Sequence, residues 1–335
     1  MREPHVATTV RTWQELEALA SDWWDLWRRC PTATPFTSPA WLLAWWHSFE
    51  PGSLRTVAVR ESGRLVGLAP FYLEDGPLGR RLLPLGIGLS DLFDLLLDPA
   101  SEGVAEAILE AMAAEPDWTS WHLEELPEGA AALTLPCPAG CTDQVAAQSA
   151  RPVLDLPDNR IDALATLPSA KRRKLRMAGH RVARRGGIVE TVRAEDVPGF
   201  LADLIRLHGA RWTAREEAGV LADDRVRRFH DASLPALAEA GLARLYRLVI
   251  EGQVAGAYYG LRHGPAAYAY LGGFDPDFSF ESPGTILLGH AIEAAAQEGA
   301  VRFDLLRGRE PYKYEWGAAD RWNQLRVIRR AGPHG

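Results

Sequence analysis

The sequence predicts an α/β fold (an α+β mixed sheet) in two similar lobes, each a central twisted mixed sheet flanked by helices. The first observation is periodicity, because amphipathic helices and alternating strands occur in both halves of the 335-residue chain. The second is their order, which is helix, helix, hairpin, strand, helix, strand in each half. The third is the similarity of two turns, ESGRLVG and EGQVAG. We therefore expect an internal duplication, with lobes at residues 1–150 and 151–335.

Capping residues and hydrophobic spacing define the elements of the first half. Thr12 and Glu15 form a T-x-x-E capping box, which predicts a helix at 12–27. Ser38, with proline after it, predicts the start of a second helix. The Ala-, Gly- and Pro-rich residues 127–152 are expected to join the lobes. The remaining predicted elements are a hairpin at 55–60 and 64–73, a strand at 90–98, a helix at 101–115 and a strand at 119–126.

The second half repeats this order behind a basic segment. AKRRKLRMAGHRVARRGG carries eight Lys or Arg between Lys171 and Arg185 and no acid. Ser169 as a cap and an apolar stripe through Leu175 and Val182 predict that it is a helix. The other predicted elements are helices at 194–212 and 223–241, a hairpin at 243–250 and 254–262, a strand at 266–275, a helix at 283–299 and a strand at 301–308.

Composition excludes several classes of protein. The net charge of −7 argues against wholesale nucleic-acid binding. No apolar run reaches membrane-spanning length, and the N-terminus lacks the apolar core of a signal peptide. Cys137 and Cys141 lack the Cys or His partners of a zinc site. We therefore expect a soluble, cytoplasmic protein with no metal and no stable membrane insertion.

The order of elements resembles that of the GNAT acetyltransferase superfamily. Two such lobes in one chain are similar to the Fem-type peptidoglycan peptidyltransferases and the CelD-like acetyltransferases of exopolysaccharide biosynthesis. The resemblance covers nearly the whole chain, and its last segment is the most specific. The segments that carry it are TPFTSPAWLLAWW (34–46), GRLVGLAPFY (63–72), KRRKLRMAGHR (171–181), LHGARW (207–212) and YLGGFDPDF…SPGTILLGHAI…FDLLRGREPYKYEWG (270–317).

The resemblance implies an N-acyltransferase. It would transfer an acetyl or longer acyl group from acyl-CoA to an amine by direct attack. The amine would belong to a sugar, a cell-envelope precursor or another small molecule, including lipid- or nucleotide-linked ones. One alternative is a Fem-type transferase that uses aminoacyl-tRNA, which the net charge disfavours. The other is a catalytically silent binding protein that keeps the fold.

The donor site is expected in two places. Ser282, Gly284 and Thr285 begin a helix, whose free N–H groups and partial positive charge suit phosphates, although an ordinary capped helix explains them too. GNAT enzymes commonly carry Q/R-x-x-G-x-G/A here, whereas this chain reads SFESPGTILLG with a single glycine before the helix. The resemblance also implies that a strand end contacts pantetheine and the thioester carbonyl through its backbone N–H groups. The candidates are Leu271, Gly272 and Gly273, for which a plain turn after a strand is the alternative.

The resemblance places an acid catalyst after the last strand. Tyr312 is the better match to the GNAT tyrosine that protonates the coenzyme A thiolate, and Tyr314 is the second choice. Asp304 and Glu310 are the nearby carboxylates that could take the proton of the amine. The structural alternative for Asp304 is an ion pair with a basic residue of the same turn.

Substrate-binding candidates lie in the same turn and on a helix. Arg307 and Lys313 belong to the turn and are the possible ion-pair partners of Asp304. His208 and Trp212 lie four residues apart on one helix face, which borders the acceptor cleft in relatives, although a packed pair is the alternative. The basic helix is either a solvated face or the binding site of a phosphate-bearing partner. That partner would be the 3′-phosphate of the donor, a lipid-linked or nucleotide sugar, or tRNA.

Overall fold

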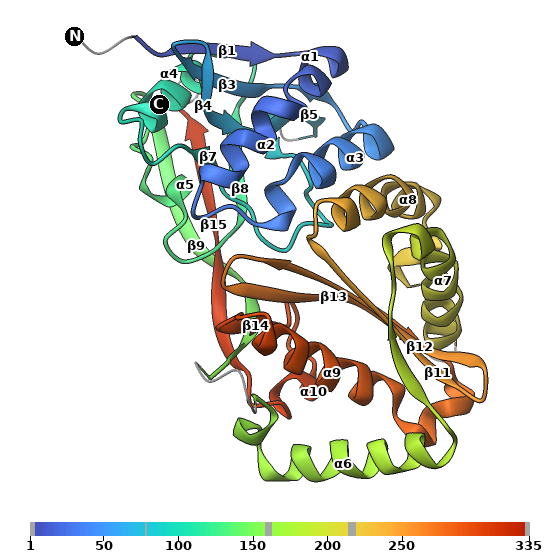
Figure 1. The fold of residues 1–335 in the computed structure, drawn as a ribbon. Helices are drawn as coiled ribbons and strands as arrows, with labels where there is room; N and C mark the ends of the chain where they lie inside the picture. The colour runs from blue at the N-terminus through green and yellow to red at the C-terminus, as the bar shows by residue number, and fades with distance from the viewer. Residues whose placement is uncertain (1–3, 78, 158–162, 214–218, 332–335) are drawn as a thin grey trace. The chain divides into compact units, whose positions relative to one another are not determined.

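The computed structural model describes residues 4–77, 79–157, 163–213 and 219–331, with side chains omitted at 211–213 (Figure 1). The chain divides into two compact units, Met1–Ser149 with Trp322–Gly335, and Ala150–Arg321. Two long strands, β9 (Cys141–Asp155) and β15 (Ala319–Arg330), each begin in one unit and end in the other. The last strand therefore returns to the first unit.

The first unit contains two sheets. One has the order β1-β3-β4-β7, and in the other β15, β8, β6, β5 and β2 are neighbours in that order. Only β6 and β8 pair in parallel among the described pairs of this unit. The bounds are β1 Val6–Val10, α1 Trp13–Ala18, α2 Ala20–Arg29, α3 Pro39–Phe49, β2 Ser53–Leu54, β3 Thr56–Glu61, β4 Arg64–Ala69, β5 Phe71–Gly76, β6 Gly79–Pro84, β7 Leu96–Leu97, α4 Val104–Ala114, β8 Ser120–Leu126 and α5 Ala131–Thr134.

The structure corrects the prediction for the first half in two places and adds elements in a third. The helix predicted at 12–27 is two helices separated by a turn at Leu19, although the capping box of Thr12 and Glu15 is confirmed. The strand predicted at 90–98 is mainly a loop, in which only β7 is extended. The segment expected to join the lobes, 127–152, contains α5 and most of β9.

Asp94 explains why the predicted strand at 90–98 does not form. Its carboxylate is buried and accepts hydrogen bonds from the N–H groups of Leu95 at 2.8 Å, Ala131 at 2.9 Å and Ala132 at 3.0 Å. The side chain thus caps the start of α5, and a carboxylate that serves this purpose holds its own segment in a loop.

The second unit has one sheet between helices. The strand order is β10-β11-β12-β13-β14-β9, and all described pairs are antiparallel except β13 with β14. Helices α7 and α8 lie on one face and α9 on the other, with α6 packed over α9 (Figure 1). The bounds are α6 Ser169–Arg184, β10 Ile188–Thr191, α7 Val197–Thr213, α8 Asp224–Glu239, β11 Ala243–Ile250, β12 Gln253–His263, β13 Ala266–Phe274, α9 Pro283–Gln297, β14 Arg302–Asp304 and α10 Pro311–Tyr314.

Every element predicted for the second half is present, so its order is confirmed. The basic segment is a helix, but Ser169 is its first residue rather than its cap, and Pro168 occupies the cap position. Within the described residues, the strands that sequence reasoning missed are β1, β2, β6, β9, β10 and β15.

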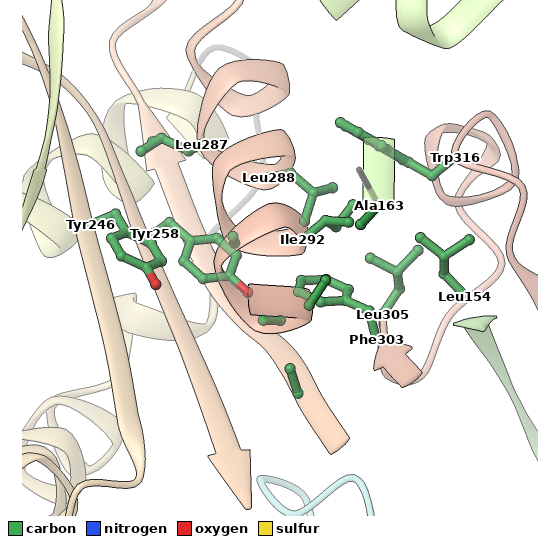
Figure 2. Packing of buried hydrophobic residues seen from close by; sticks show 14 of the residues in the cluster. Leu154, Ala163, Tyr246, Tyr258, Leu287, Leu288, Ile292, Phe303, Leu305 and Trp316 are labelled. Carbon is green, nitrogen blue, oxygen red and sulfur yellow. The ribbon is translucent and has the colours of Figure 1, made fainter. Parts of the chain in front are cut away.

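The core of the second unit fixes α9 against the sheet. Leu287, Leu288 and Ile292 of α9 belong to the same buried cluster as Tyr258 and Phe303, which come from β12 and β14 (Figure 2). Complete burial of such a side chain contributes about 1.5–3 kcal/mol, so this contact holds the start of α9 firmly beside the strands.

Candidate functional site

Strands β13 and β14 part at a fork. Their described pairing ends with Tyr268 opposite Asp304, whereas β13 continues to Phe274. The register between β12 and β13 shifts just beyond the fork, where Tyr259 pairs with Leu271 and the next pair is Gly260 with Ala269. The extra residue between these pairs makes a bulge, and bulges often occur next to active sites because they redirect the backbone.

The strand-end residues predicted to bind the donor are not equivalent. The N–H group of Asp275 donates to the carbonyl of Ala255 on β12 at 3.0 Å. Because backbone groups alternate along a strand, we infer that Leu271 and Gly273 also direct theirs to β12, whereas Gly272 directs its own to the open side of β13. A Cβ on Gly273 would lie 2.5 Å from the backbone nitrogen of His208, so this glycine permits close contact with α7.

The start of α9 has an open N-terminus. Ser282, the cap residue, has left-handed backbone angles (φ 58°, ψ 58°), and its side chain makes no capping hydrogen bond. The N–H of Thr285 donates to the carbonyl of Ser282 at 3.0 Å, and Pro283 has no N–H. Among the described residues, the N–H of Gly284 has no hydrogen-bond acceptor, and a Cβ there would meet only the ring of Phe274 at 3.9 Å. Gly284 therefore offers a donor and free space.

The turn after β14 is stabilised by contacts of a buried side chain. Asp304 is 1% exposed and pairs with Arg151, and it also accepts the N–H of Leu306 at 2.9 Å. Leu306 has a φ of 60°, which is uncommon for a residue with a side chain. Asp304 therefore pairs with Arg151 of β9, whereas Lys313, one of its expected partners, pairs with Glu310.

Lys313 stabilises the same turn. Its Nζ donates to the carbonyls of Leu306 at 3.0 Å, Arg307 at 2.7 Å and Gly308 at 3.2 Å, and it pairs with Glu310 at 2.9 Å. Lys313 is 3% exposed, so these contacts account for its burial without any ligand. Arg307 is partly exposed and contributes its carbonyl to this network.

Tyr312 is placed near the fork. It lies on α10, is 44% exposed, and is close enough to Tyr258 for its phenol to affect that buried residue. Burial raises the pKa of Tyr258 well above its ordinary value, and the phenols of Tyr246 and Tyr312 raise it further. A Cβ on Gly260 would lie 2.6 Å from the hydroxyl oxygen of Tyr258, and Gly260 pairs with Ala269, directly beyond the fork.

The other two candidates of the turn differ in exposure and bonding. Tyr314, the second choice for the acid, donates its hydroxyl to Asp320 at 2.6 Å and accepts a hydrogen bond from Arg309 at 3.3 Å. The Glu310 side chain is 54% exposed, although Lys313 pairs with it. Glu310 is thus accessible to a ligand, whereas Tyr314 is engaged in the turn.

Buried polar side chains lie on the face of the sheet that α7 and α8 cover, opposite to α9. His208 is 4% exposed, and His230 is fully buried beside the rings of Tyr259 and Tyr270, both at 5.7 Å between centroids. Burial and the proximity of His208 lower the pKa of His230 to about 3, so it is neutral at physiological pH. Trp212 belongs to α7, but its side chain lies outside the described residues.

The basic helix α6 has two different faces. On the inner face, Lys171 and Lys174 pair with Glu315 at 3.3 and 3.2 Å, and Lys171 lies 4.3 Å from the ring centroid of Trp316. On the outer face, an open hollow of about 530 Å³ is lined by Ser169, Ala170, Arg172, Arg173 and Arg176. Among the described residues, no carboxylate pairs with these three arginines.

Sequence reasoning missed several of these residues. Arg151, His230, Tyr259 and Tyr270 occur without a motif, and only folding brings them to the site. Arg181 was part of the basic segment but was not distinguished within it. No cluster of His, Cys, Asp or Glu among the described residues could hold a metal ion, and no described helix is long and apolar enough to cross a membrane.

Comparison with known proteins gives matches to a family model and to solved structures. Residues 169–314 match the model described as acetyltransferase (GNAT) domain. The structure of FemX has a TM-score of 0.66 and 14% identity, with 96% of each chain covered. A putative lysylphosphatidylglycerol synthetase C-terminal domain from Agrobacterium fabrum has a TM-score of 0.59 and 13% identity, with 96% of this chain and 93% of that one covered.

A third structure, a conserved protein of unknown function from Bacteroides thetaiotaomicron, has a TM-score of 0.61 and 12% identity, with 97% of this chain and 100% of that one covered. Among curated protein sequences, no significant match was found. At these identities the likeness shows the fold alone. The chain therefore shares its fold with FemX over nearly its whole length, and residues 169–314 match the acetyltransferase (GNAT) domain model.

Proposed function

We propose that the chain is an N-acyltransferase that transfers an acetyl or longer acyl group from acyl-CoA to an amine by direct attack. The observation that carries the proposal is the fork between β13 and β14, with an exposed tyrosine beside it and the open start of α9 in the same unit. The acceptor would be an amine of a sugar, a cell-envelope or exopolysaccharide precursor or another small molecule, free or linked to a lipid or nucleotide. We place the reaction in the cytoplasm, where acyl-CoA is available.

The donor would bind along the open side of β13. Its thioester carbonyl would accept a hydrogen bond from the N–H of Gly272, because that group is directed away from β12. Its phosphates would lie at the start of α9, near the N–H of Gly284 and the hydroxyl of Ser282. Leu271 and Gly273 would shape the strand, and Thr285 would hold the first turn of the helix.

Tyr312 would be the general acid. A phenol has a pKa of about 10 and a thiol one of about 8.5, so a tyrosine hydroxyl can protonate a departing thiolate within hydrogen-bond reach. The partial exposure of Tyr312 leaves room for a ligand, whereas the hydroxyl of Tyr314 is bonded to Asp320. We therefore keep Tyr312 as the acid.

Glu310 is the better candidate for the base that takes the proton of the amine. Its carboxylate is half exposed, so an amine or a bridging water can approach it. Asp304 is buried and paired with Arg151, so its carboxylate is better suited to stabilising the end of β14 than to accepting a proton from the amine. Lys313 and Arg307 would support the turn rather than hold the substrate, and His208 and Trp212 would border the acceptor side.

The second candidate is a Fem-type transferase that takes its acyl group from aminoacyl-tRNA. The observation that favours it is the outer face of α6, where Arg172, Arg173 and Arg176 line an open hollow and pair with no described carboxylate. Arginines of this kind suit phosphates. The net charge of −7 weighs against a large nucleic-acid interface.

A thermal-shift panel separates the candidates. The ligands are acetyl-CoA, longer acyl-CoAs and aminoacyl-tRNA, each titrated against the full chain. A ligand at 100 times its dissociation constant stabilises the folded state by about 2.7 kcal/mol, which shifts the melting temperature measurably. We expect stabilisation by an acyl-CoA. A shift with aminoacyl-tRNA alone would favour the second candidate, and no shift with any ligand would favour a catalytically silent protein.

A further inference from the structure

Arg181 and Phe280 meet at the start of α9. Arg181 belongs to α6, and its Nη2 donates to the hydroxyl oxygen of Ser282 at 3.3 Å. The guanidinium carbon lies 4.7 Å from the ring centroid of Phe280, which precedes α9 by three residues. The basic helix therefore delivers one arginine to the helix terminus at which the donor phosphates are proposed to bind.

The charge of Arg181 is not balanced by a described carboxylate. Arg185, the C-cap residue of α6, pairs with Glu251 at 2.7 Å and Glu281 at 3.0 Å. Within the described residues Arg181 has no such partner, and its Nε is buried without a hydrogen-bond acceptor. A guanidinium has five donors in a planar fork that matches phosphate oxygens, so an anion that binds here would receive donors that the protein leaves unused.

Phe280 is an exposed aromatic ring beside that cation. Its relative exposure is 70%, the highest value among the exposed large hydrophobic side chains of the described residues. Phe278, two residues earlier in the same short connection, is buried, so the exposure of Phe280 is particular to that residue. An exposed ring beside an arginine is suited to stacking with a nucleobase whose phosphates the arginine contacts.

We propose that Arg181 and Phe280 bind the adenine nucleotide end of the donor, with Arg181 on a phosphate and Phe280 against the base. The inference rests on the proposed function, because it assigns the nucleotide part of the same donor. Ser282, which Arg181 contacts, and Gly284, with its open N–H, lie in the first turn of α9. An arginine from α6 thus supplies the phosphate donors that a glycine-rich loop would otherwise provide.

The test is calorimetric titration of the full chain with three probes. Coenzyme A carries both the nucleotide and pantetheine, ADP carries the nucleotide alone, and pantetheine lacks it. The variants are Arg181→Gln, Arg181→Lys and Phe280→Ala. Two control variants remove an arginine and a large hydrophobic side chain from the exposed surface of α6. They are Arg184→Gln, whose Nε donates to the carbonyl of His180, and Met177→Ala.

We expect Arg181→Gln to weaken coenzyme A and ADP binding roughly 10- to 100-fold, because a charge-assisted hydrogen bond is lost. Phe280→Ala should weaken both roughly 5- to 100-fold through lost stacking. Arg181→Lys should retain part of the affinity, since the charge remains but the fork does not. Pantetheine binding and the melting temperature should stay unchanged in all variants, and the controls should bind every probe like the wild type.

The results separate this inference from the proposed function. If the wild type binds coenzyme A, and Arg181→Gln and Phe280→Ala bind it equally well, the inference is overturned while the proposed donor stands. If the wild type binds ADP but not coenzyme A, and Arg181→Gln loses ADP, the nucleotide site is supported while coenzyme A as donor fails. Binding of neither probe by the wild type overturns both.

Discussion

The carboxylate of Asp304 is paired with the guanidinium of Arg151, and the two residues are only 1% and 8% exposed. Asp304 ends β14, and Arg151 lies two residues before Val153, its register partner on β9. The pair thus ties neighbouring strands together where the chain turns towards α10. Since Asp304 also accepts the N–H of Leu306, its side chain fixes the strained start of that turn.

The first prediction is that this pair is structural. Asp304→Asn or Arg151→Met should each lower the free energy of unfolding by about 3–5 kcal/mol, because each removes one side of a buried ion pair. Urea denaturation of both variants and of the double variant measures the coupling, and the double variant should lose less than the sum of the singles. Asp304→Asn with normal stability but a reduced rate would instead make Asp304 a catalytic group.

The second prediction concerns the start of α9. Gly284→Asp should weaken coenzyme A binding, because a negative charge would lie where the donor phosphates are proposed to bind. Gly284→Ala is the matched control, since a Cβ there meets only the Phe274 ring at 3.9 Å. We expect the alanine variant to bind coenzyme A within a few fold of the wild type. Equal affinity of the aspartate variant would place the phosphates elsewhere.

Hydrophobic periodicity, glycines and prolines predicted most elements of the second half of the fold. They also predicted the strand and the helix that lie at the fork. The strand ending in Gly272 and Gly273 is recognisable from its composition, and the helix behind Ser282 from its proline. The function of Gly273 was not predictable, because only the folded chain shows that α7 passes within 2.5 Å of its would-be Cβ. A glycine required for packing and one required for a ligand look the same in a sequence.

The features that the sequence did not predict depend on residues far apart in the chain. Arg151 and Asp304 are 153 residues apart, and no local pattern connects them. The segment 127–152 was expected to join the lobes because of its Ala, Gly and Pro residues, but the strand β9, which passes there from the first unit to the second, was not predicted. Its pairing with the neighbouring strand β15, rather than its own propensity, makes it a strand.

The third prediction concerns the outer face of α6. Changing Arg172, Arg173 and Arg176 together to Gln should leave the free energy of unfolding within about 0.5 kcal/mol of the wild type, because exposed residues without ion pairs contribute little. If a phosphorylated substrate binds in the hollow, its KM should rise and its dependence on salt should flatten. Kinetics at low and high ionic strength test this. Unchanged values would leave the arginines as a solvated surface.

The fourth prediction is a pH dependence in the first unit. Burial raises the pKa of Asp94 from 3.8 to about 6, against the opposing effect of its backbone hydrogen bonds. The folded state therefore binds this proton more tightly than the unfolded chain, and stability falls as the pH rises from about 4 to 6. The change is about 3 kcal/mol at about 1.4 kcal/mol per pKa unit.

Denaturant titrations of the wild type and Asp94→Asn between pH 4 and 7 isolate this contribution, because other carboxylates titrate equally in both proteins. The difference in unfolding free energy between the two proteins should change in favour of the variant as the pH rises. A constant difference would mean that the three N–H groups bonded to Asp94 keep its carboxylate ionised across the range.

The last prediction concerns Tyr312. General acid catalysis typically contributes 10²- to 10⁴-fold, so Tyr312→Phe should lower kcat by about that factor. The substitution removes only a hydroxyl from a side chain that is 44% exposed, and stability and the KM for acyl-CoA should therefore change little. Steady-state kinetics with a responsive acceptor measure both parameters, and the melting temperature reports on folding.

Tyr314→Phe is the matched control for Tyr312→Phe. Its hydroxyl donates to Asp320 at 2.6 Å, so its loss should cost about 0.5–1.5 kcal/mol of stability while kcat is kept. Glu310→Gln should lower kcat without this loss of stability if the carboxylate takes the proton of the amine. A Tyr312→Phe enzyme with full kcat would remove this phenol from the mechanism. If Tyr314→Phe then carried the loss of rate, the acid would be the tyrosine bonded to Asp320.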